Sequence, residues 1–468
     1  MGLVSTISNA ANGLGVIQVQ TATASHNIAN ANTEGYSRQY AVQTESVPSQ
    51  LAGTRGYIGG GIVLKGVYQI RDQYVEQQLP LAFSNSAAST AQSDALAAVS
   101  ALDPDATGSL TTAMGDFYSA MRTLAQNASD SGLRQAAVDS ARVLAATFNR
   151  TASSLETARD GIDENITNLV NEVNATSASI AELNRRIAPV VTAGGSPNDL
   201  LDERQRLVDK LAGLIGAQPV PDDHGNVSMV LPGGTTLVNT TLSCELKTQS
   251  QPGNKGHTDV VFTPADGSPD IVLDRTTVGG TIAGLLTARD VALGGASSGL
   301  DTLAFEFGQM INGINSAGFT ATGGAGGNVF DVGAVVEDAA FKIKIDANLA
   351  ADPSLLAAAA TALTAPGDAT NLQALIDSEN TLLSTGLTAQ GTLAKVVSDF
   401  GVLTQSASDG AAFDTAMLNH LTDSRESTSG VAMDDEIVNL TRAQRAYEAL
   451  SKVITTANSM LETLLDIV

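Results

Sequence analysis

Apolar and small residues recur at alternating intervals of four and three at both ends of the chain. Near the start, the series runs through Leu3, Ile7, Ala10, Leu14, Ile17, Thr21, Ala24, Ile28 and Ala31. Near the end, it runs through Ile437, Leu440, Gln444, Tyr447, Ser451, Ile454, Asn458, Leu461, Leu465 and Val468. Heptad spacing of this kind predicts a long helix at each end, with one stripe that packs against another helix. We expect the two helices to form one coiled-coil-like module, parallel or antiparallel, from residues 1–35 and 431–468.

The composition of these two stripes bears on what they pack against. One of the two alternating positions near the end carries Gln444, Ser451 and Asn458, and polar residues in a seam cost stability but set the register. No Asp, Glu, Lys or Arg occurs before Glu34, whereas a helix exposed on one face of a monomer normally carries charge there. A charge-free helix can be buried against copies of itself without burying a charge. The pattern therefore favours a module built for a polymer, and an ordinary helix pair within one domain is the alternative.

Helical spacing continues through most of the chain between the two ends. It predicts helices over residues 72–102, 110–128, 131–188, 197–213 and 281–317, and Ala-rich helices from Pro353 onward. Pro189 is expected to end the longest of them. The Asp and Arg residues of the helix at 197–213 are expected on its outer face. These helices form the predicted long-helix body, which covers residues 36–216 and 281–430.

Two stretches break the helical pattern. The Gly-rich, alternating stretch from Arg55 to Ile70 predicts a hairpin or an extended segment. Between Gln218 and about Asp274, the turn clusters DDHGN, PGG and ADGSPD separate short runs of Val, Thr and Leu. We expect a small β domain over residues 217–280, inserted into the helical body. The predicted fold class is mainly α with an inserted β domain.

Charge and cysteine content exclude several classes of protein. The chain of 468 residues has 25 basic and 49 acidic side chains, and its formal net charge of −24 disfavours nucleic acid and anionic membranes as partners. No run approaches 18 apolar residues, so no membrane insertion is expected, and no Sec-type signal is visible. The single Cys244 excludes an internal disulfide framework.

No catalytic, cofactor or metal motif emerges from the sequence. The four histidines, His26, His224, His257 and His420, lie far apart, without the short spacings typical of metal-ligand pairs. The letters from Gly295 to Gly299 match a nucleophile elbow, but they interrupt a helical stretch and are expected to form a loop. We therefore expect no catalytic residues, no cofactor and no metal site, and a protein that is not an enzyme.

The stretch from His26 to Tyr40 carries the strongest motif, HNIANANTEGYSRQY. Asn30 and Asn32 tolerate left-handed backbone geometry, and Gly35 can end a helix where φ turns positive. The stretch resembles the signature that follows the first helix in bacterial flagellar axial proteins. Its ending is similar to that of the hook-associated protein 1 (FlgK) family. The residues that carry this resemblance are Asn27, Asn30, Asn32, Gly35, Tyr36, Ser37 and Arg38.

Four further segments are similar to the same family: residues 58–79, 198–212, 279–290 and 429–468. The similarity leaves the β region from about 218 to 275 uncovered. Glu34 departs from the family pattern, because many members have Pro there.

This resemblance implies a structural protein of the bacterial flagellum that forms the hook–filament junction. It implies export through the flagellar type III system, from the cytoplasm to the extracellular flagellum, and polymerisation through the N- and C-terminal helices. The implied partners are further copies in a ring, the hook protein, a second hook–filament junction protein and an export chaperone that binds the C-terminal helix. The expected assembly seam consists of Leu3, Ile7, Leu14, Ile17, Ile28, Ile437, Leu440, Tyr447, Ile454, Leu461 and Leu465.

Two alternatives remain open from the sequence. The chain could be another axial protein, of the hook or the distal rod. It could also be a secreted hydrolase or adhesin carried on axial-type termini, with its activity in the β domain.

Overall fold

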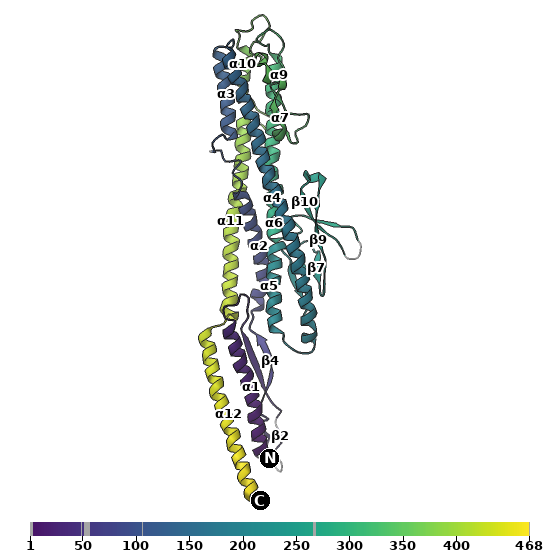
Figure 1. The fold of residues 1–468 in the computed structure, drawn as a ribbon, viewed down its shortest axis with the longest axis vertical. Helices are drawn as coiled ribbons and strands as arrows, with labels where there is room; N and C mark the ends of the chain where they lie inside the picture. Colours follow the sequence, from purple (N-terminus) through teal and green to yellow (C-terminus); the bar gives the residue numbers. More distant parts are fainter. Residues whose placement is uncertain (1–2, 48, 51–56, 105, 265–267, 468) are drawn as a thin grey trace.

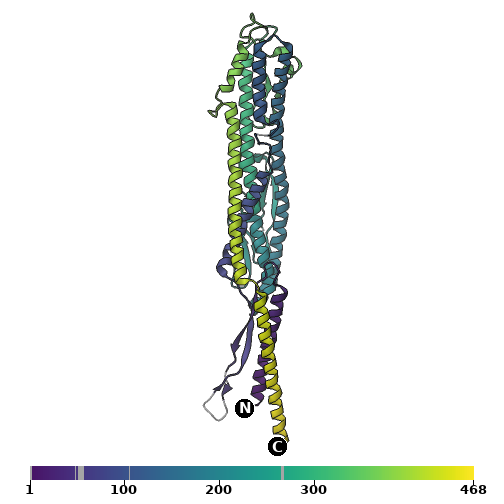
Figure 2. The same cartoon turned by 90° about the vertical axis from the view of Figure 1, so that its left-hand side faces the viewer.

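The computed structural model describes residues 3–47, 49–50, 57–104, 106–264 and 268–467. Arg55, at the start of the predicted hairpin, and Val468, at the end of the predicted C-terminal stripe, lie outside these residues. The molecule is long and thin, and both ends of the chain lie at the same tip (Figures 1 and 2). We call the narrow part at this tip the stem and the larger helical part the body.

The stem contains the two terminal helices and one hairpin. Helix α1 (Leu3–Ala29) packs against α12 (Met433–Ile467), and the two run antiparallel. Strand β1 (Gln39–Glu45) pairs with β4 (Ile62–Gln69), with a register shift after Val42, and both strands pack on α1. The short strands β2 (Ser49–Gln50) and β3 (Tyr57–Ile58) extend this hairpin. The hairpin, which the sequence grouped with the helical body, thus lies beside the N-terminal helix.

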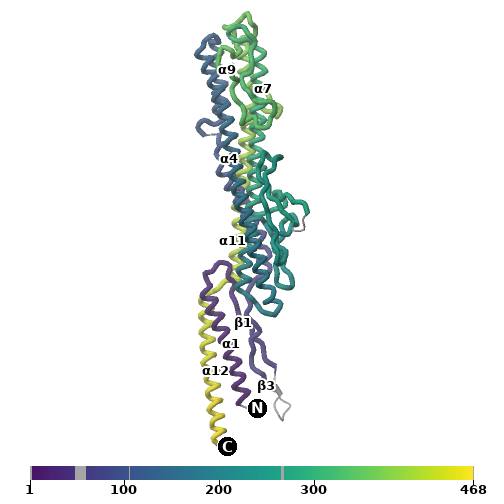
Figure 3. The backbone as a smooth tube through the Cα atoms, turned by 45° about the vertical axis from the view of Figure 1, so that its right-hand side comes forward, coloured from purple at the N-terminus to yellow at the C-terminus, as the bar shows by residue number. Residues whose placement is uncertain are grey.

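Long helices build the body: α2 (Gln73–Ala97), α3 (Leu110–Gln126), α4 (Ser131–Thr192), α5 (Asn198–Ile215), α6 (Gly280–Thr287), α7 (Gly294–Ala317) and α11 (Ala389–Ser429). Four of them begin at a side-chain cap, from Asp72, Ser109, Asp130 or Thr388, which satisfies amides that the first turn leaves free. The 62 residues of α4 span about 93 Å at 1.5 Å per residue. This one helix runs along most of the body (Figures 1 and 3).

Two local predictions about these helices were wrong. α4 continues through Pro189 to Thr192, because a proline in the last turn removes one helical hydrogen bond and Ala193 N–H still donates to Pro189 O at 3.1 Å. Residues 295–299 form no loop, since they lie inside α7. A π-helical segment, η2 (Ala288–Leu293), joins α6 to α7 without a break, which makes one continuous helical rod.

Two small sheets lie beside α4. One has the order β5 (Gln218–Pro221), β6 (Val227–Val230), β7 (Thr236–Asn239) and β8 (Leu242–Ser243). The other has the order β11 (Ile271–Leu273), β10 (Thr258–Phe262) and β9 (Leu246–Ser250), with the short helix η1 (Pro252–Asn254) between β9 and β10. The sheets bury Met229, Leu237, Val238 and Val260, which join the core of the helical body. The predicted class, mainly α with an inserted β region, is confirmed.

The half of the body farthest from the stem contains the short elements β12 (Phe330–Asp331), α8 (Ala339–Lys342), β13 (Lys344–Ile345), α9 (Ala347–Ala351), η3 (Pro353–Leu355), α10 (Thr370–Asp377) and η4 (Ser378–Asn380), with α9 and α10 near its tip (Figure 1). The Ala-rich residues 356–369 are not helical, against the prediction, because their backbone bonds to neighbours instead. Asn315 accepts from Ala357 N–H, for example, and Asn371 donates to Ala357 O. None of the helices in the described residues is long and apolar enough to span a membrane.

Candidate assembly site: the stem and its waist

The seam between α1 and α12 is built from small and aliphatic residues. Ala10, Gly13, Val16, Ile17 and Ala24 are buried on α1, and Ala443 and Ala457 are buried on α12. Gly13 lies directly under Leu450, where an added Cβ would come within 2.8 Å of Leu450 Cδ1. The absence of a side chain at Gly13 therefore sets how closely the two helices approach.

The buried stripe of α12 differs from the predicted one at one of its two alternating seam positions. The prediction placed Gln444, Ser451 and Asn458 in the seam, whereas the residues one position earlier, Ala443, Leu450 and Ala457, face α1. Gln444 and Asn458 are exposed and Ser451 is half-buried. The seam is therefore apolar at both alternating positions, and the polar residues lie at its edge.

The predicted seam residues fall into three groups by burial. Ile17 is buried, and Leu3, Ile7, Leu14, Ile28, Leu440, Ile454 and Leu461 are half-buried. Ile437, Tyr447 and Leu465 are exposed, at 50%, 41% and 75%. The helices are antiparallel and Gly13 lies opposite Leu450, so Leu3 lies at the same level along the helix axis as Met460. Leu465 therefore lies beyond the described start of α1.

A further apolar stripe on α12 was not part of the predicted seam. Val453, Met460 and Leu464 recur at intervals of seven and four and are 41%, 52% and 53% exposed. This spacing places the three side chains on one side of the helix, next to the seam. We call Val453, Met460, Leu464 and Leu465 the α12 apolar face.

The stem meets the body at a polar cluster that we call the waist: Asn27, Ser37, Arg38, Gln39, Arg71, Asn198, Asp199, Asp202 and Glu436. Asn27, which is 1% exposed, is its centre. The Asn27 side chain donates to Gln39 O at 2.8 Å and accepts from Gln39 N–H at 3.0 Å, as a neighbouring strand would. It also accepts from the Tyr36 hydroxyl at 2.8 Å. This one amide fixes the chain where it turns back from α1 into β1.

The turn after α1 depends on Gly35 rather than on the asparagines. Gly35 has a φ of 72°, which favours glycine, and an added Cβ would lie 2.7 Å from Arg206 Cγ, so the exposed Arg206 side chain would have to shift. Asn30 and Asn32, expected to tolerate left-handed geometry, do not adopt it. Asn30 instead donates from its side chain to His26 O at 3.0 Å and accepts from the Thr33 hydroxyl at 3.3 Å, and Asn32 is exposed.

Ser37 and Arg71 tie this turn to α5. Asp202 of α5 accepts from Ser37 N–H at 3.3 Å and from Arg71 at 2.7 Å, and Arg71 also donates to the Ser37 hydroxyl at 3.1 Å. At the start of α5, Asn198 donates to Gln39 Oε1 and to Val67 O. Three parts of the chain thus meet at one point: the turn after α1, the segment of family similarity at residues 58–79, and α5.

Arg38 ties the same turn to the C-terminal part of the chain. Its backbone N–H donates to Ser429 O, the last residue of α11, at 2.8 Å, and its side chain donates to Glu436 at 2.7 Å. Glu436 is 2% exposed and lies in the first turn of α12, where the helix dipole favours negative charge. Burial and the nearby Asp199, Asp202 and Glu436 carboxylates raise the pKa of the Tyr36 hydroxyl, which keeps it protonated as a donor to Asn27.

The Asp and Arg residues of α5 were predicted to lie on an outer face. This prediction was wrong for three of them. Asp202, Arg204 and Asp209 are 5%, 9% and 7% exposed, because α5 packs between α2 and α4. Burial, with the neighbouring Arg71 charge, lowers the pKa of Arg204 to about 10, and burial raises the pKa of Asp209. Arg425 of α11 approaches Asp209 to 3.1 Å, which links this helix to the chain just before α12.

Sequence reasoning missed Arg71, Asp202 and Glu436 as site residues. Each lies in a segment of family similarity, but its partner is more than 30 residues away in the sequence, and heptad spacing gives no signal for such a pair. The signal that could have identified these residues was the concentration of charged residues in those segments.

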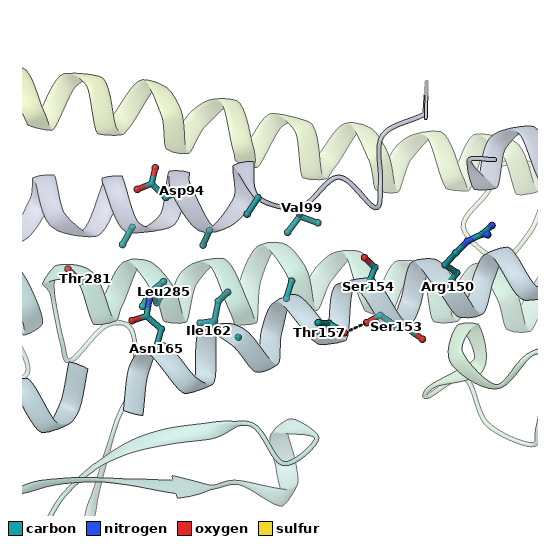
Figure 4. A pocket seen from close by; sticks show the side chains of 15 residues that line it. Asp94, Val99, Arg150, Ser153, Ser154, Thr157, Ile162, Asn165, Thr281 and Leu285 are labelled. Atoms are coloured by element: carbon teal, nitrogen blue, oxygen red, sulfur yellow. Dashed lines mark hydrogen bonds between the residues drawn. The ribbon is translucent and has the colours of Figure 1, made fainter. Parts of the chain in front are cut away.

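A separate hollow opens between α2, α4 and α6, with a volume of about 820 Å³ (Figure 4). Its lining is mostly small and aliphatic, including Ile162 and Leu285, with Asp94 and Arg150 among the polar residues. Thr157 donates to the backbone of its own helix, at Ser153 O. The lining residues form no arrangement of nucleophile, base and oxyanion donors.

The paired terminal helices α1 and α12 and the body inserted between them are the features to compare with known proteins. Residues 424–467 match the C-terminal region of the flagellar basal body rod FlgEFG proteins, which places the chain in the class of flagellar axial proteins. Residues 97–330, half of the chain, match the helical domain of the flagellar hook-associated protein FlgK. The chain therefore belongs to the FlgK family of flagellar hook-associated proteins, and the resemblance seen in the sequence is confirmed.

Individual relatives agree with this assignment over their full length. Flagellar hook-associated protein 1 of Escherichia coli K12 is 26% identical over 546 aligned residues, covering 99% of this chain and 100% of the relative. The protein of the same name from Bacillus subtilis strain 168 is 25% identical, covering 98% and 97%. The structure of the flagellar hook junction protein FlgK from Burkholderia pseudomallei superimposes with a TM-score of 0.66 at 19% identity, covering 75% of this chain and 100% of that chain. This last similarity shows that the fold is shared.

Proposed function

We propose that this protein forms the junction between hook and filament, as a ring of copies that polymerise through their N- and C-terminal helices. Membership of the hook-associated family supports the location, and the Burkholderia relative is itself a flagellar hook junction protein. The neighbours in this proposal are the hook protein on one side and a second junction protein on the other.

The observation that carries the proposal is the α12 apolar face. Its four side chains are 41% to 75% exposed, although each is an aliphatic or thioether group whose burial is favourable by about 1.5–3 kcal/mol. The stripe borders the α1–α12 seam, so a helix from a second copy could extend the seam without disturbing it. We infer that neighbouring copies pack on this face, together with the exposed Ile437 and Tyr447 of the predicted seam.

Export to the extracellular flagellum through the flagellar type III system completes the proposal. A flagellar export chaperone is the expected partner before export, and an amphipathic helix such as α12 suits a binding groove. A peptide covering Met433 to Val468 should compete with the full chain for that chaperone. An absence of competition would place the chaperone site elsewhere on the chain.

The assembly test replaces exposed apolar residues of α12 by aspartate. Met460→Asp and Leu464→Asp, made singly and together, should leave the monomer folded, because about half of each residue is already exposed to solvent. In cells that lack the native copy, we expect each variant to be exported but not to restore filaments attached to hooks, which electron microscopy would count. Immunogold labelling of the wild type should give a single spot at the filament base.

The matched control is Val402→Asp, which places the same charge on an exposed apolar position of the body helix α11, where the side chain is 65% exposed. We expect normal attachment of filaments with this variant. Normal attachment with the Met460 and Leu464 double variant would contradict the role of α12 in polymerisation. A label spread along the hook or the filament would contradict the junction itself.

A further inference from the structure

We propose that Glu156, Asp160 and His257 form a binding site for a divalent transition-metal ion, with Zn²⁺ as the preferred ion, that clamps the β region to helix α4. This site is independent of the assembly surface. The sequence carries no motif for this site, because about a hundred residues separate the two carboxylates from His257.

The three side chains converge from two elements. Glu156 and Asp160 lie four residues apart on α4, on one face of the helix, and His257 lies just before β10, after the η1 turn. One ligand atom from each residue lies within 4.8 Å of the others. Ligands at about 2.1 Å from a tetrahedral zinc ion lie roughly 3.4 Å apart, so small rotations of the two carboxylates would complete the site.

The hydrogen bonds of His257 are those of a metal ligand. The ring is 2% exposed, and its Nδ1 lies 2.9 Å from Asp163 Oδ2. Asp163 also accepts from Thr258 N–H at 3.1 Å and from the Arg289 guanidinium at 2.6 Å. Because a carboxylate can only accept, His257 must donate to it from Nδ1. A histidine that donates to a carboxylate from one nitrogen and presents the other to an ion is the usual arrangement around bound metals.

The second nitrogen of His257 then has no hydrogen-bond partner in the part of the chain that the structure describes. With the proton on Nδ1, Nε2 carries a lone pair, is buried, makes no hydrogen bond, and lies 3.2 Å from Glu156 Oε1, which is also an acceptor. Two facing acceptors repel unless a cation or a proton lies between them. A metal ion satisfies both atoms, and the adjacent Asp160 carboxylate, which is exposed and forms no ion pair with the described residues, supplies a third ligand.

The surrounding charge favours a cation. Arg159 contacts Glu156 at 3.2 Å, and Arg289 is held by Asp163 and Asp290, so the two guanidiniums are already paired with carboxylates. One imidazole and two carboxylates match zinc and its neighbours in the first transition row better than Mg²⁺ or Ca²⁺, which prefer oxygen ligands alone. Because His257 belongs to the β region and the carboxylates belong to α4, the ion would join the two.

The test is calorimetric titration of the full, untagged chain with ZnCl₂, with MgCl₂ as the comparison ion. We expect one Zn²⁺ per chain and no saturable Mg²⁺ binding. Asp160→Asn should weaken Zn²⁺ binding by roughly tenfold or more, and it should fold normally because the side chain is exposed. Glu164→Gln is the matched control, since it removes the same charge one turn further along α4 from an exposed position, and its affinity should equal that of the wild type.

Three results would overturn the proposal. The first is the absence of Zn²⁺ binding to the wild type. The second is an affinity that Asp160→Asn and His257→Gln both leave unchanged. The third is loss of binding in Cys244→Ser but not in Asp160→Asn, which would assign the ion to the half-buried thiol.

Discussion

Removal of the Asn27 side chain should open the waist locally. In Asn27→Ala, the N–H and C=O of Gln39 lose the side chain that satisfies both of them, and Gln39 is only 8% exposed. A buried polar group left without a partner costs about 1–3 kcal/mol, so the two groups together give roughly 2–6 kcal/mol. The Tyr36 hydroxyl adds little, because that residue is half-buried and reaches water. Partial relaxation of the turn toward solvent places the expected loss at about 2–4 kcal/mol.

Native-state hydrogen exchange at the Gln39 amide measures this loss directly, because that amide donates to Asn27. Each 1.4 kcal/mol corresponds to a factor of ten, so exchange should accelerate roughly 30- to 700-fold. Amides in the middle of α4 should keep their wild-type protection, since the waist can open without unfolding the body.

Asn32→Ala is the matched control for this variant. It removes the same amide from the same motif, but Asn32 is exposed, so its effect should stay within about 0.5 kcal/mol. Equal exchange rates at Gln39 in the two variants would refute the assignment of Asn27 as the centre of the waist. Unchanged exchange in Asn27→Ala would refute it equally.

Two further changes test the turn and the burial of charge. Gly35→Ala should destabilise the stem by about 1–2 kcal/mol, since φ is 72° and the Arg206 side chain occupies the added space. Gly15→Ala lies in open space on a helix and should raise the free energy of unfolding by up to about 1 kcal/mol. Urea titration of both variants distinguishes the two effects. Burial raises the pKa of Glu76 above its ordinary value of 4.5. The unfolded chain therefore releases this proton first, and its contribution to stability falls as the pH rises from about 4.5 to the raised pKa. In Glu76→Gln, the urea midpoint should depend less on pH across that range than it does in the wild type. An unchanged pH dependence of the midpoint would contradict the argument.

The sequence predicted the helices well because their periodicity is local. The stripe from Leu155 to Ile187 identified α4 almost to its observed end, and the turn clusters after Gln218 identified the β region. The stem helices were identified for the same reason. Their register was partly wrong because a series of alternating threes and fours fits two neighbouring faces of one helix. Alanines at 443 and 457 carried the seam, and alanine gives a weaker apolar signal than leucine.

The waist could not be predicted in the same way. Its contacts join residues that are distant in sequence, such as Arg38 with Glu436 and Arg71 with Asp202, and polar side chains carry no periodicity that identifies their partners. The charged residues of α5 were placed at the surface because charge usually lies there. Asp202 is buried because the turn at Ser37 and the side chain of Arg71 supply its hydrogen bonds. The His257 cluster was missed because its three ligands come from α4 and from the β region.

The shape of the stem has a mechanical consequence. The chain passes between stem and body at Ile70 to Asp72 and again at Gly430 to Ala432. A torque applied to the stem thus reaches the body through these two covalent connections and the hydrogen bonds of the waist. Helices resist bending because every turn shares the load, whereas a cluster of polar contacts yields one bond at a time. A joint between a stiff stem and a stiff body would therefore bend at the waist first, and each copy in the proposed ring could tilt its body without disturbing the packing of its terminal helices.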